Sequence, residues 1–386
     1  MKDNHNRRDF IKDTAAVAAG MMLLPTLPLS ATANVIYEPA VNIPVKKIET
    51  RIKFSVIGIN HSHIYGMVDA VTRGGGQLVS FYVKEADLAA AFAKKYPQAK
   101  QAGSEQEILE DPSIQLVLSS GIPIDRAPLG IRVMQHGKDY LTDKPGVITL
   151  EQFAEVRKVQ KVTKRIYSIM YSERFESKAT VRAGELVKAG AIGKVIQTIN
   201  IAPHKMSPKT RPEWFFDPKF CGGILTDIGS HQFDQYLFFT GSTKAEVVAS
   251  QVANVHHPQY PKLQDFGDVM LRGNGGMGYI RLDWFTPDAI PTFGDGRLTI
   301  LGTDGYIEVR KTMDIAGKPG GDHLYLANQK EIKYYDCSKD ILPFGEQLVN
   351  DIINRTETAM PQEHCFLATE LALLAQQKAQ HISLQL

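Results

Sequence analysis

Short apolar runs alternate with amphipathic segments through the first half of the chain. The runs contain few polar residues, as in strands that are buried on both faces. The segments between them repeat apolar positions at helical spacing. This alternation predicts βαβ units with right-handed crossovers, and hence a doubly wound parallel sheet. The expected strands are residues 54–57, 78–83, 114–118, 140–141 and 165–170, and the expected helices are residues 63–72, 87–96, 127–136 and 149–163.

The pattern changes after Lys178. Apolar and polar positions then alternate singly, which is typical of strands with one buried and one polar face. Turn sequences such as Gly273-Asn274-Gly275-Gly276 separate these strands. The pattern predicts an open, mainly antiparallel sheet. The expected strands are residues 195–201, 246–255, 269–271, 278–284, 298–301 and 307–310, and the expected helices are residues 179–189, 346–354 and 363–381.

A chain of 386 residues is too long for one ordinary core. We therefore expect two α/β domains, a nucleotide-binding domain over residues 51–175 and a substrate and oligomerisation domain over residues 176–386. A net charge of +2, with no basic run beyond the extreme N-terminus, argues against nucleic-acid binding. Three scattered cysteines form neither a disulfide framework nor a zinc knuckle.

The N-terminal segment has the composition of an export signal. Arg7 and Arg8 precede an apolar stretch that ends in Ala31-Thr32-Ala33, which suits cleavage by a signal peptidase. The adjacent arginines indicate the twin-arginine route, which exports folded proteins. The stretch is too short and too interrupted by proline to remain as a membrane span. We expect a signal peptide over residues 1–33, an arm over residues 34–50, and a periplasmic or extracellular protein.

The segment from Cys221 to Asp234 contains an acid and an imidazole four residues apart. If the segment is helical, Asp227 and His231 share one face, where an acid can hold the imidazole in one tautomer and near neutral pKa. The glycines around them leave room for a ligand to approach the backbone. By itself the pair is equally compatible with an ion pair on the surface of a capped helix.

A glycine follows the first expected strand, where a dinucleotide-binding turn reads G-x-G-x-x-G. Gly58 fits the first position, but Asn60 and His63 occupy the second and third. Asn tolerates the left-handed conformation, whereas the ring of His63 would need space between helix and sheet. Glu85 follows the second strand and can bind the ribose, while its neighbour Lys84 would favour a 2′-phosphate. Alternatively, His61 and His63 bind a metal, although H-x-H is a weak signal.

The tripeptide Asp143-Lys144-Pro145 follows a short expected strand. Ligands of open α/β sheets bind at the carboxyl ends of the strands, so Lys144 can donate to a substrate hydroxyl there. A surface lysine in a turn would have the same local sequence.

Together, these motifs resemble the Gfo/Idh/MocA oxidoreductase family, named for glucose–fructose oxidoreductase and inositol dehydrogenase. The resemblance rests on the βαβ pattern, on Asp143-Lys144-Pro145, and on the diglycine that leads to Asp227 and His231. It implies an N-terminal Rossmann-like domain, a C-terminal domain with an open sheet, and bound NAD or NADP, of which we expect NAD. It also implies oxidation of a secondary hydroxyl on a sugar, glycoside or cyclitol.

The family resemblance implies a role for each matching residue. Lys144 would lie beside the nicotinamide and the reacting hydroxyl, Asp227 would bind substrate and orient His231, and His231 would take the hydroxyl proton. Charged and aromatic residues near the domain junction would bind hydroxyls and stack on sugar faces. Trp214 is equally compatible with a position in the core or at a subunit interface. Trp284 is more compatible with packing on the face of the sheet. The expected cofactor contacts are Gly58, Asn60, His61, His63, Glu85 and Lys144, and the expected substrate contacts are Arg174, His204, Arg211 and Trp214.

Two other functions remain compatible with the sequence. Bound NAD could oxidise a glycoside transiently, so that the aglycone is eliminated and the nucleotide regenerated. Without nucleotide, the chain would be a sugar-binding protein or a metal-dependent lyase. In every case a small carbohydrate is the expected partner, and apolar residues on the outer face of the open sheet predict a homo-oligomer.

Overall fold

The computed structural model describes residues 49–383. The expected signal peptide and almost all of the expected arm lie outside the described residues, as do residues 384–386. No helix within the described part of the chain is long and apolar enough to cross a membrane.

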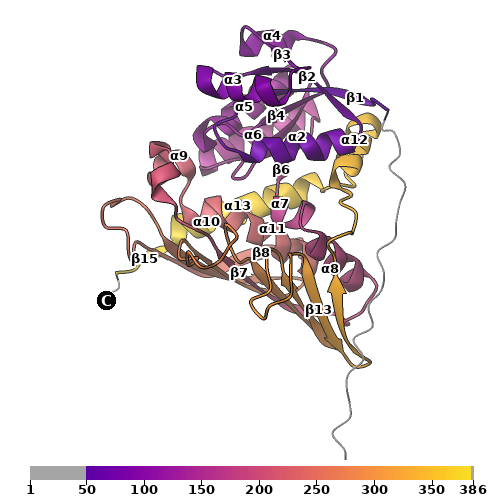
Figure 1. The fold of residues 1–386 in the computed structure, drawn as a ribbon, viewed down its shortest axis with the longest axis vertical. Helices are drawn as coiled ribbons and strands as arrows, with labels where there is room; N and C mark the ends of the chain where they lie inside the picture. The colour runs from indigo at the N-terminus through magenta and orange to yellow at the C-terminus, as the bar shows by residue number, and fades with distance from the viewer. Residues whose placement is uncertain (1–48, 384–386) are drawn as a thin grey trace, which may run out of the picture. The chain divides into compact units, whose positions relative to one another are not determined.

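The first sheet consists of six parallel strands with helices between them (Figure 1). Its strand order is β3-β2-β1-β4-β5-β6, so the direction of winding reverses between β1 and β4. In a doubly wound sheet this reversal opens a crevice at the carboxyl ends of the strands. The strands are β1 (Ile52–Ile57), β2 (Gly76–Tyr82), β3 (Lys100–Gln101), β4 (Leu116–Ser119), β5 (Asp139–Asp143) and β6 (Tyr167–Met170), and the helices are α2 (His63–Arg73), α3 (Ala86–Lys95), α4 (Glu105–Glu110), α5 (Pro123–Gln135) and α6 (Leu150–Thr163).

The second sheet has nine strands, and it is antiparallel except for two pairs. Its order is β14-β13-β12-β11-β7-β10-β9-β8-β15, with β7 parallel to β10 and β8 parallel to β15. The prediction of a doubly wound domain followed by an open, mainly antiparallel sheet is confirmed. The strands are β7 (Val195–Pro203), β8 (Ala245–Ala253), β9 (Phe266–Gly273), β10 (Met277–Asp283), β11 (Arg297–Gly302), β12 (Gly305–Arg310), β13 (His323–Asn328), β14 (Ile332–Asp336) and β15 (Gln380–His381).

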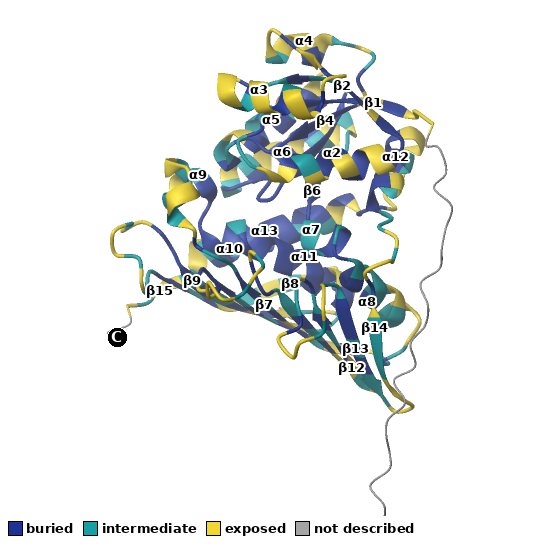
Figure 2. Ribbon diagram, in the orientation of Figure 1, coloured by how far each residue is buried: buried dark blue, intermediate teal, exposed yellow. Residues whose placement is uncertain are grey.

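Helices cover one face of this sheet (Figure 1). Buried residues are concentrated in α10, α11 and α13 (Figure 2). The opposite face carries apolar side chains in register: Ile199 pairs with Tyr279, which pairs with Met270. Ile199 and Met270 are 36% and 54% exposed, and no element among residues 49–383 covers them. The helices of this half are α7 (Ser172–Phe175), α8 (Lys178–Lys188), α9 (Pro218–Cys221), α10 (Ile224–Asp227), α11 (Gly229–Thr240), α12 (Phe344–Asn354) and α13 (Gln362–Lys378).

The last two helices join the two halves of the fold. Helix α12 packs on α2, and their backbones meet where Gly74 and Gly345 lie together. A Cβ at Gly345 would overlap the carbonyl oxygen of Ala70, so the close approach requires glycine. At the start of α13, the Gln362 side chain bonds both backbone groups of Tyr167 in β6, at 2.9 and 3.0 Å. These contacts hold the second sheet against the first.

Candidate active site

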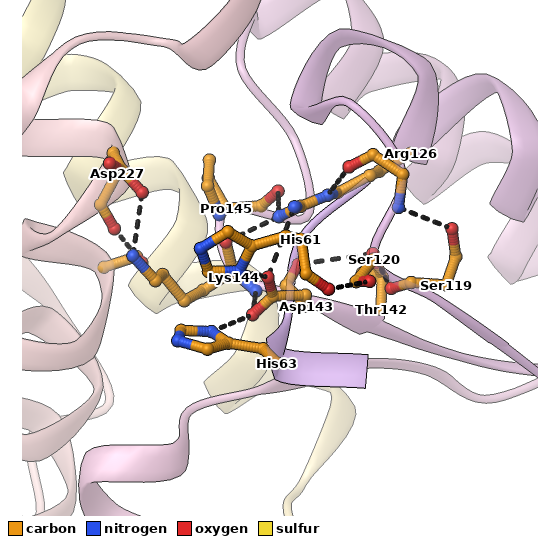
Figure 3. Close-up of polar contacts among 12 residues, drawn as sticks. His61, His63, Ser119, Ser120, Arg126, Thr142, Asp143, Lys144, Pro145 and Asp227 are labelled. Atoms are coloured by element: carbon orange, nitrogen blue, oxygen red, sulfur yellow. Dashed lines mark hydrogen bonds and ion pairs between the residues drawn. The ribbon is translucent and has the colours of Figure 1, made fainter. Parts of the chain in front are cut away.

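Lys144 and Asp227 meet across the two halves of the fold (Figure 3). Lys144 follows β5, and its Nζ donates to Oδ1 of Asp227, at the end of α10, over 2.8 Å. Their side chains are 9% and 16% exposed. Burial by itself would raise the pKa of the Asp227 carboxyl, but Lys144, with smaller contributions from His61 and Arg211, outweighs burial and the pKa is lowered. The pair is therefore charged, and both residues line a cavity of about 410 Å³.

His231 lines the same cavity, as the sequence predicted. Helices α10 and α11 are separated only by Ile228, which has helical dihedral angles, so Asp227 and His231 share one side of the segment. Among the described residues, however, no hydrogen bond joins them, and the buried Nδ1 of His231 has no partner. The expectation that Asp227 orients His231 is thus wrong: the stronger cation Lys144 binds the carboxylate instead.

The pKa of His231 is also lower than the sequence suggested. Burial lowers it from 6.5 to about 3, while the neighbouring carboxylate of Glu173 only partly opposes that shift. The imidazole is consequently neutral at physiological pH. It can accept a proton from a bound hydroxyl, and Glu173 would stabilise the cation that results.

Glu173 was not among the predicted site residues. It lies in α7, directly after β6, and accepts hydrogen bonds from Lys311 at 2.5 Å and from Gln232 at 2.8 Å. Burial opposes its ionisation, but Lys311, His231 and His204 lower the pKa of its carboxyl well below the usual value. Its position after the last parallel strand was the one signal in the sequence, because carboxyl ends of such strands carry site residues.

Arg174, by contrast, is not a substrate contact. Its guanidinium forms two hydrogen bonds to the buried carboxylate of Asp234, at 2.6 and 2.7 Å. His364 of α13 binds the same carboxylate at 2.8 Å. Arg174 is needed in this buried cluster, because an unpaired carboxylate inside the fold would be destabilising. It is not among the residues that line the cavity.

The other three predicted substrate contacts line the cavity wall. His204 donates through Nδ1 to the Ala202 carbonyl at 3.1 Å, and burial lowers its pKa. Arg211 and Trp214 lie on the segment between β7 and α9. Trp284 also lines the cavity, although it was expected to pack on the sheet; it does both, since it directly follows β10 and is 6% exposed.

The turn after β1 retains the backbone geometry that a dinucleotide needs. Gly58 has φ +77°, and a Cβ there would approach the Gly121 Cα to 3.2 Å. The side chain of Asn60 donates to Glu85 over 2.8 Å, which links the turn to the residue after β2. These residues line a second cavity of about 290 Å³ at the carboxyl ends of β1, β2 and β4. Gly58, Asn60 and Glu85 therefore fit a nucleotide, with one Glu85 oxygen left for a ribose hydroxyl.

His61 and His63 both turn toward Asp143 (Figure 3). The Nδ1 atom of each ring lies 3.0 Å from a different oxygen of this carboxylate. Arg126 and the backbone N–H of Lys144 also donate to it, at 3.2 and 2.8 Å. The His63 ring thus lies outside the helix–sheet interface, with 41% of its side chain exposed. It therefore does not need the space between helix and sheet that a third glycine would leave.

These three residues form a group that could hold a metal ion, His61, His63 and Asp143. Asp143, however, already accepts hydrogen bonds from four donors. Two of them, the Arg126 guanidinium and the Lys144 backbone N–H, would not be displaced readily by a metal. Burial opposes its ionisation, but His63 and Arg126 keep the pKa of Asp143 well below its usual value. A hydrogen-bonded carboxylate accounts for the cluster without a metal. Direct contacts of His61 and His63 with a nucleotide stay a prediction.

Comparison with known proteins points to one family. The profile of the GFO/IDH/MocA C-terminal domain matches residues 180–308. The crystal structure of a candidate oxidoreductase from Erwinia carotovora atroseptica SCRI1043 is 43% identical, with a TM-score of 0.84 over 86% of this chain and 100% of that one. Scyllo-inositol 2-dehydrogenase (NAD(+)) from Bacillus subtilis is 25% identical over 67% of this chain and 74% of its own. The NADP(+) enzyme IolW of the same organism is 25% identical over 47% and 51%.

Proposed function

Because the chain belongs to the Gfo/Idh/MocA family of oxidoreductases, we propose that it oxidises a secondary hydroxyl of a sugar, glycoside or cyclitol with NAD or NADP. One observation carries the proposal: Lys144, Asp227 and His231 line a single cavity, although Lys144 comes from the other half of the fold. The dehydrogenase activities named for the two inositol-oxidising relatives support it.

The nucleotide would be held at the ends of β1 and β2. Gly58 permits the close approach of the pyrophosphate, Asn60 continues the turn, and Glu85 can accept from a ribose hydroxyl. A nicotinamide bound beside Lys144 supplies the acceptor for the hydride that leaves the carbinol carbon. Glu85 and the NAD(+)-dependent relative favour NAD, whereas Lys84 could bind the 2′-phosphate of NADP. Calorimetric titration with both nucleotides tests this preference.

The protein side chains would bind the substrate, accept its hydroxyl proton and stabilise the resulting charge. Lys144 donates a hydrogen bond to the substrate oxygen. Asp227 holds the lysine in place, and the same carboxylate accepts a hydrogen bond from a second hydroxyl of the substrate. The neutral imidazole of His231 takes the hydroxyl proton as the carbonyl forms. Glu173 then stabilises the imidazolium electrostatically, because its carboxylate is held ionised by Lys311.

Replacement of the lysine tests the proposed function. Lys144→Met should lower kcat with a cyclitol or sugar by about 10²–10⁴-fold, because the substrate oxygen loses its donor. The measurement is the absorbance of reduced nicotinamide during steady-state turnover, with nucleotide affinity recorded in parallel. Lys219→Met, an exposed lysine of α9, is the matched control. A Lys144→Met enzyme with wild-type turnover, or a wild-type protein that reduces no nucleotide with any sugar, would contradict the proposal.

We also propose that the chain is exported through the twin-arginine route and assembles through its open sheet. Arg7-Arg8 and the apolar stretch behind them support export. The exposed ladder of Ile199, Tyr279 and Met270 supports self-association, because apolar faces of this kind need cover. Mass spectrometry of the secreted protein tests export: an intact N-terminus would contradict cleavage near residue 33.

A further inference from the structure

Arg211 brings a positive charge to the active-site cavity that the described residues leave without an ion pair. The other charges of the cavity wall are paired: Lys144 with Asp227, Glu173 with Lys311, and Arg126 with Asp143. No carboxylate of residues 49–383 lies within ion-pair distance of the Arg211 guanidinium. The three pairs cancel, so the cavity keeps one net positive charge. A partly buried cation of this kind calls for an anion from outside.

The surroundings of Arg211 hold its guanidinium in one position. Its Nε donates to the Met206 carbonyl at 3.1 Å, and Nη2 donates to the Lys205 carbonyl at 3.4 Å. The group also stacks over the rings of Phe215, Trp284 and Phe293, whose centroids lie 4.3, 4.9 and 5.3 Å from it. A guanidinium fixed along one edge and on its faces loses little conformational entropy when it binds a ligand.

The remaining edge of the guanidinium is free to bind. Among the described residues, no hydrogen bond involves Nη1, and this atom is not one of the buried polar atoms that lack a partner. It is therefore not fully buried, and Arg211 lines the active-site cavity. Guanidinium groups bind planar anions such as carboxylates through paired N–H donors. Burial also lowers the pKa of Arg211, and the field of Asp227 offsets only part of that shift.

We propose that the substrate is a sugar acid, a uronate or aldonate whose carboxylate binds Arg211 while its secondary hydroxyl lies between Lys144 and His231. This inference rests on the proposed oxidoreductase function and names its substrate class. A single carboxylate balances the single net charge of the cavity, whereas a phosphate monoester would leave an excess of negative charge. A neutral sugar would leave Arg211 with only the field of Asp227, a carboxylate that already forms an ion pair with Lys144.

The test compares substrates that differ only in the carboxylate. Purified enzyme with its nucleotide is assayed with glucuronate against glucose, galacturonate against galactose, and gluconate against glucitol. We expect kcat/KM to be at least 10-fold higher for the acid in one or more pairs. In Arg211→Gln, that ratio should fall about 10-fold or more, to near equality of acid and neutral sugar, mainly through KM, because the carboxylate loses its partner. Arg157→Gln, which changes an arginine of α6 outside the cavity whose side chain is 40% exposed, is the matched control.

A binding measurement separates the two proposals. Both tryptophans of the chain, Trp214 and Trp284, line this cavity, so their fluorescence reports ligands there. Sugar acids should change the fluorescence at lower concentration than the neutral sugars do, and Arg211→Gln should remove the difference. If sugar acids bind in this way but no nucleotide is reduced, the oxidoreductase proposal fails and the sugar-acid site stands.

Two outcomes would overturn the sugar-acid site while the oxidoreductase function stands. One is equal or faster turnover of the neutral sugar in all three pairs, with no effect of Arg211→Gln on the ratios. The other is weakened nucleotide binding in Arg211→Gln with unchanged discrimination, because the guanidinium would then pair with the nucleotide. Thermal unfolding of Arg211→Gln distinguishes either outcome from loss of the fold, since the side chain stacks on three aromatic rings.

Discussion

Lys144, Asp227 and His231 show how far a local motif determines chemistry at a single residue. The spacing of Asp227 and His231 predicted that both would face one site, and they do. It could not predict their partners. A carboxylate binds the nearest strong donor, and here that donor is Lys144, which is 83 residues away in the sequence. His231 is neutral, since burial outweighs the field of Glu173, and its Nδ1 has no partner among residues 49–383.

The low pKa of His231 should appear in the acid stability of the protein. In the unfolded chain its pKa is near 6.5, and in the folded protein it is about 3. Between these values only the unfolded state binds the proton, so stability falls as the pH falls through this window. The free energy of unfolding of wild type should drop about 1.4 kcal/mol per pH unit faster than that of His231→Gln between pH 6 and 4.

Urea denaturation at several pH values measures this difference. His61 and His204 also have pKa values lowered by burial, but they are present in both proteins and cancel. His136→Gln, which changes an exposed histidine of the same chain, should follow wild type. Parallel curves for wild type and His231→Gln would contradict the low pKa.

At the scale of elements, the turn between β1 and α2 departs from the usual glycine pattern yet keeps its shape. Gly58 supplies the positive φ, and Asn60 uses its side chain to bind Glu85. The side chain of His63 turns away to Asp143, so a third glycine is not needed for packing. The sequence predicted the turn from Gly58, but the destination of the histidines depended on Asp143, which reaches them from β5.

Gly58→Ala should damage both the fold and nucleotide binding. The left-handed φ of +77° is unfavourable for alanine, and its Cβ would lie 3.2 Å from the Gly121 Cα. We expect a loss of about 1–3 kcal/mol in the free energy of unfolding and at least a tenfold weaker nucleotide affinity. Gly66→Ala is the matched control, because it lies within α2 with no atom near its added Cβ and should stabilise by up to about 1 kcal/mol. Calorimetric titration of nucleotide into each variant decides, and wild-type affinity in Gly58→Ala would count against this turn as the nucleotide site.

At the scale of the whole molecule, the nine-stranded sheet has two different faces. Helices bury one, and the other presents apolar residues that neighbour one another across strands. The same period-two alternation that predicted the strands also predicted this outer face. Whether that face is covered depends on a second copy of the chain, which is why the proposed assembly belongs to this scale.

Met270→Lys should disrupt the proposed assembly. The Met270 side chain is 54% exposed in the single chain and lies in the apolar ladder, so a buried lysine at an interface would lack a partner. Multi-angle light scattering should show an oligomer for wild type and a lower mass for Met270→Lys. Val162→Lys, on α6 and away from the sheet, should keep the wild-type mass. A monomeric wild-type protein at micromolar concentration would refute the assembly.

The sequence by itself determined the elements, the fold class and the motifs at the ends of the strands. Those features depend on short-range periodicity and on residues such as Gly58 and Pro145, whose backbone preferences are local. Only the tertiary structure decided the pairings: Lys144 with Asp227, Asp234 with Arg174 and His364, and Glu173 with Lys311. Each is set by burial and by distances between segments far apart in the chain. The same competition among buried charges assigned Arg174 to the interior and left Arg211 facing the cavity, which residue type alone could not reveal.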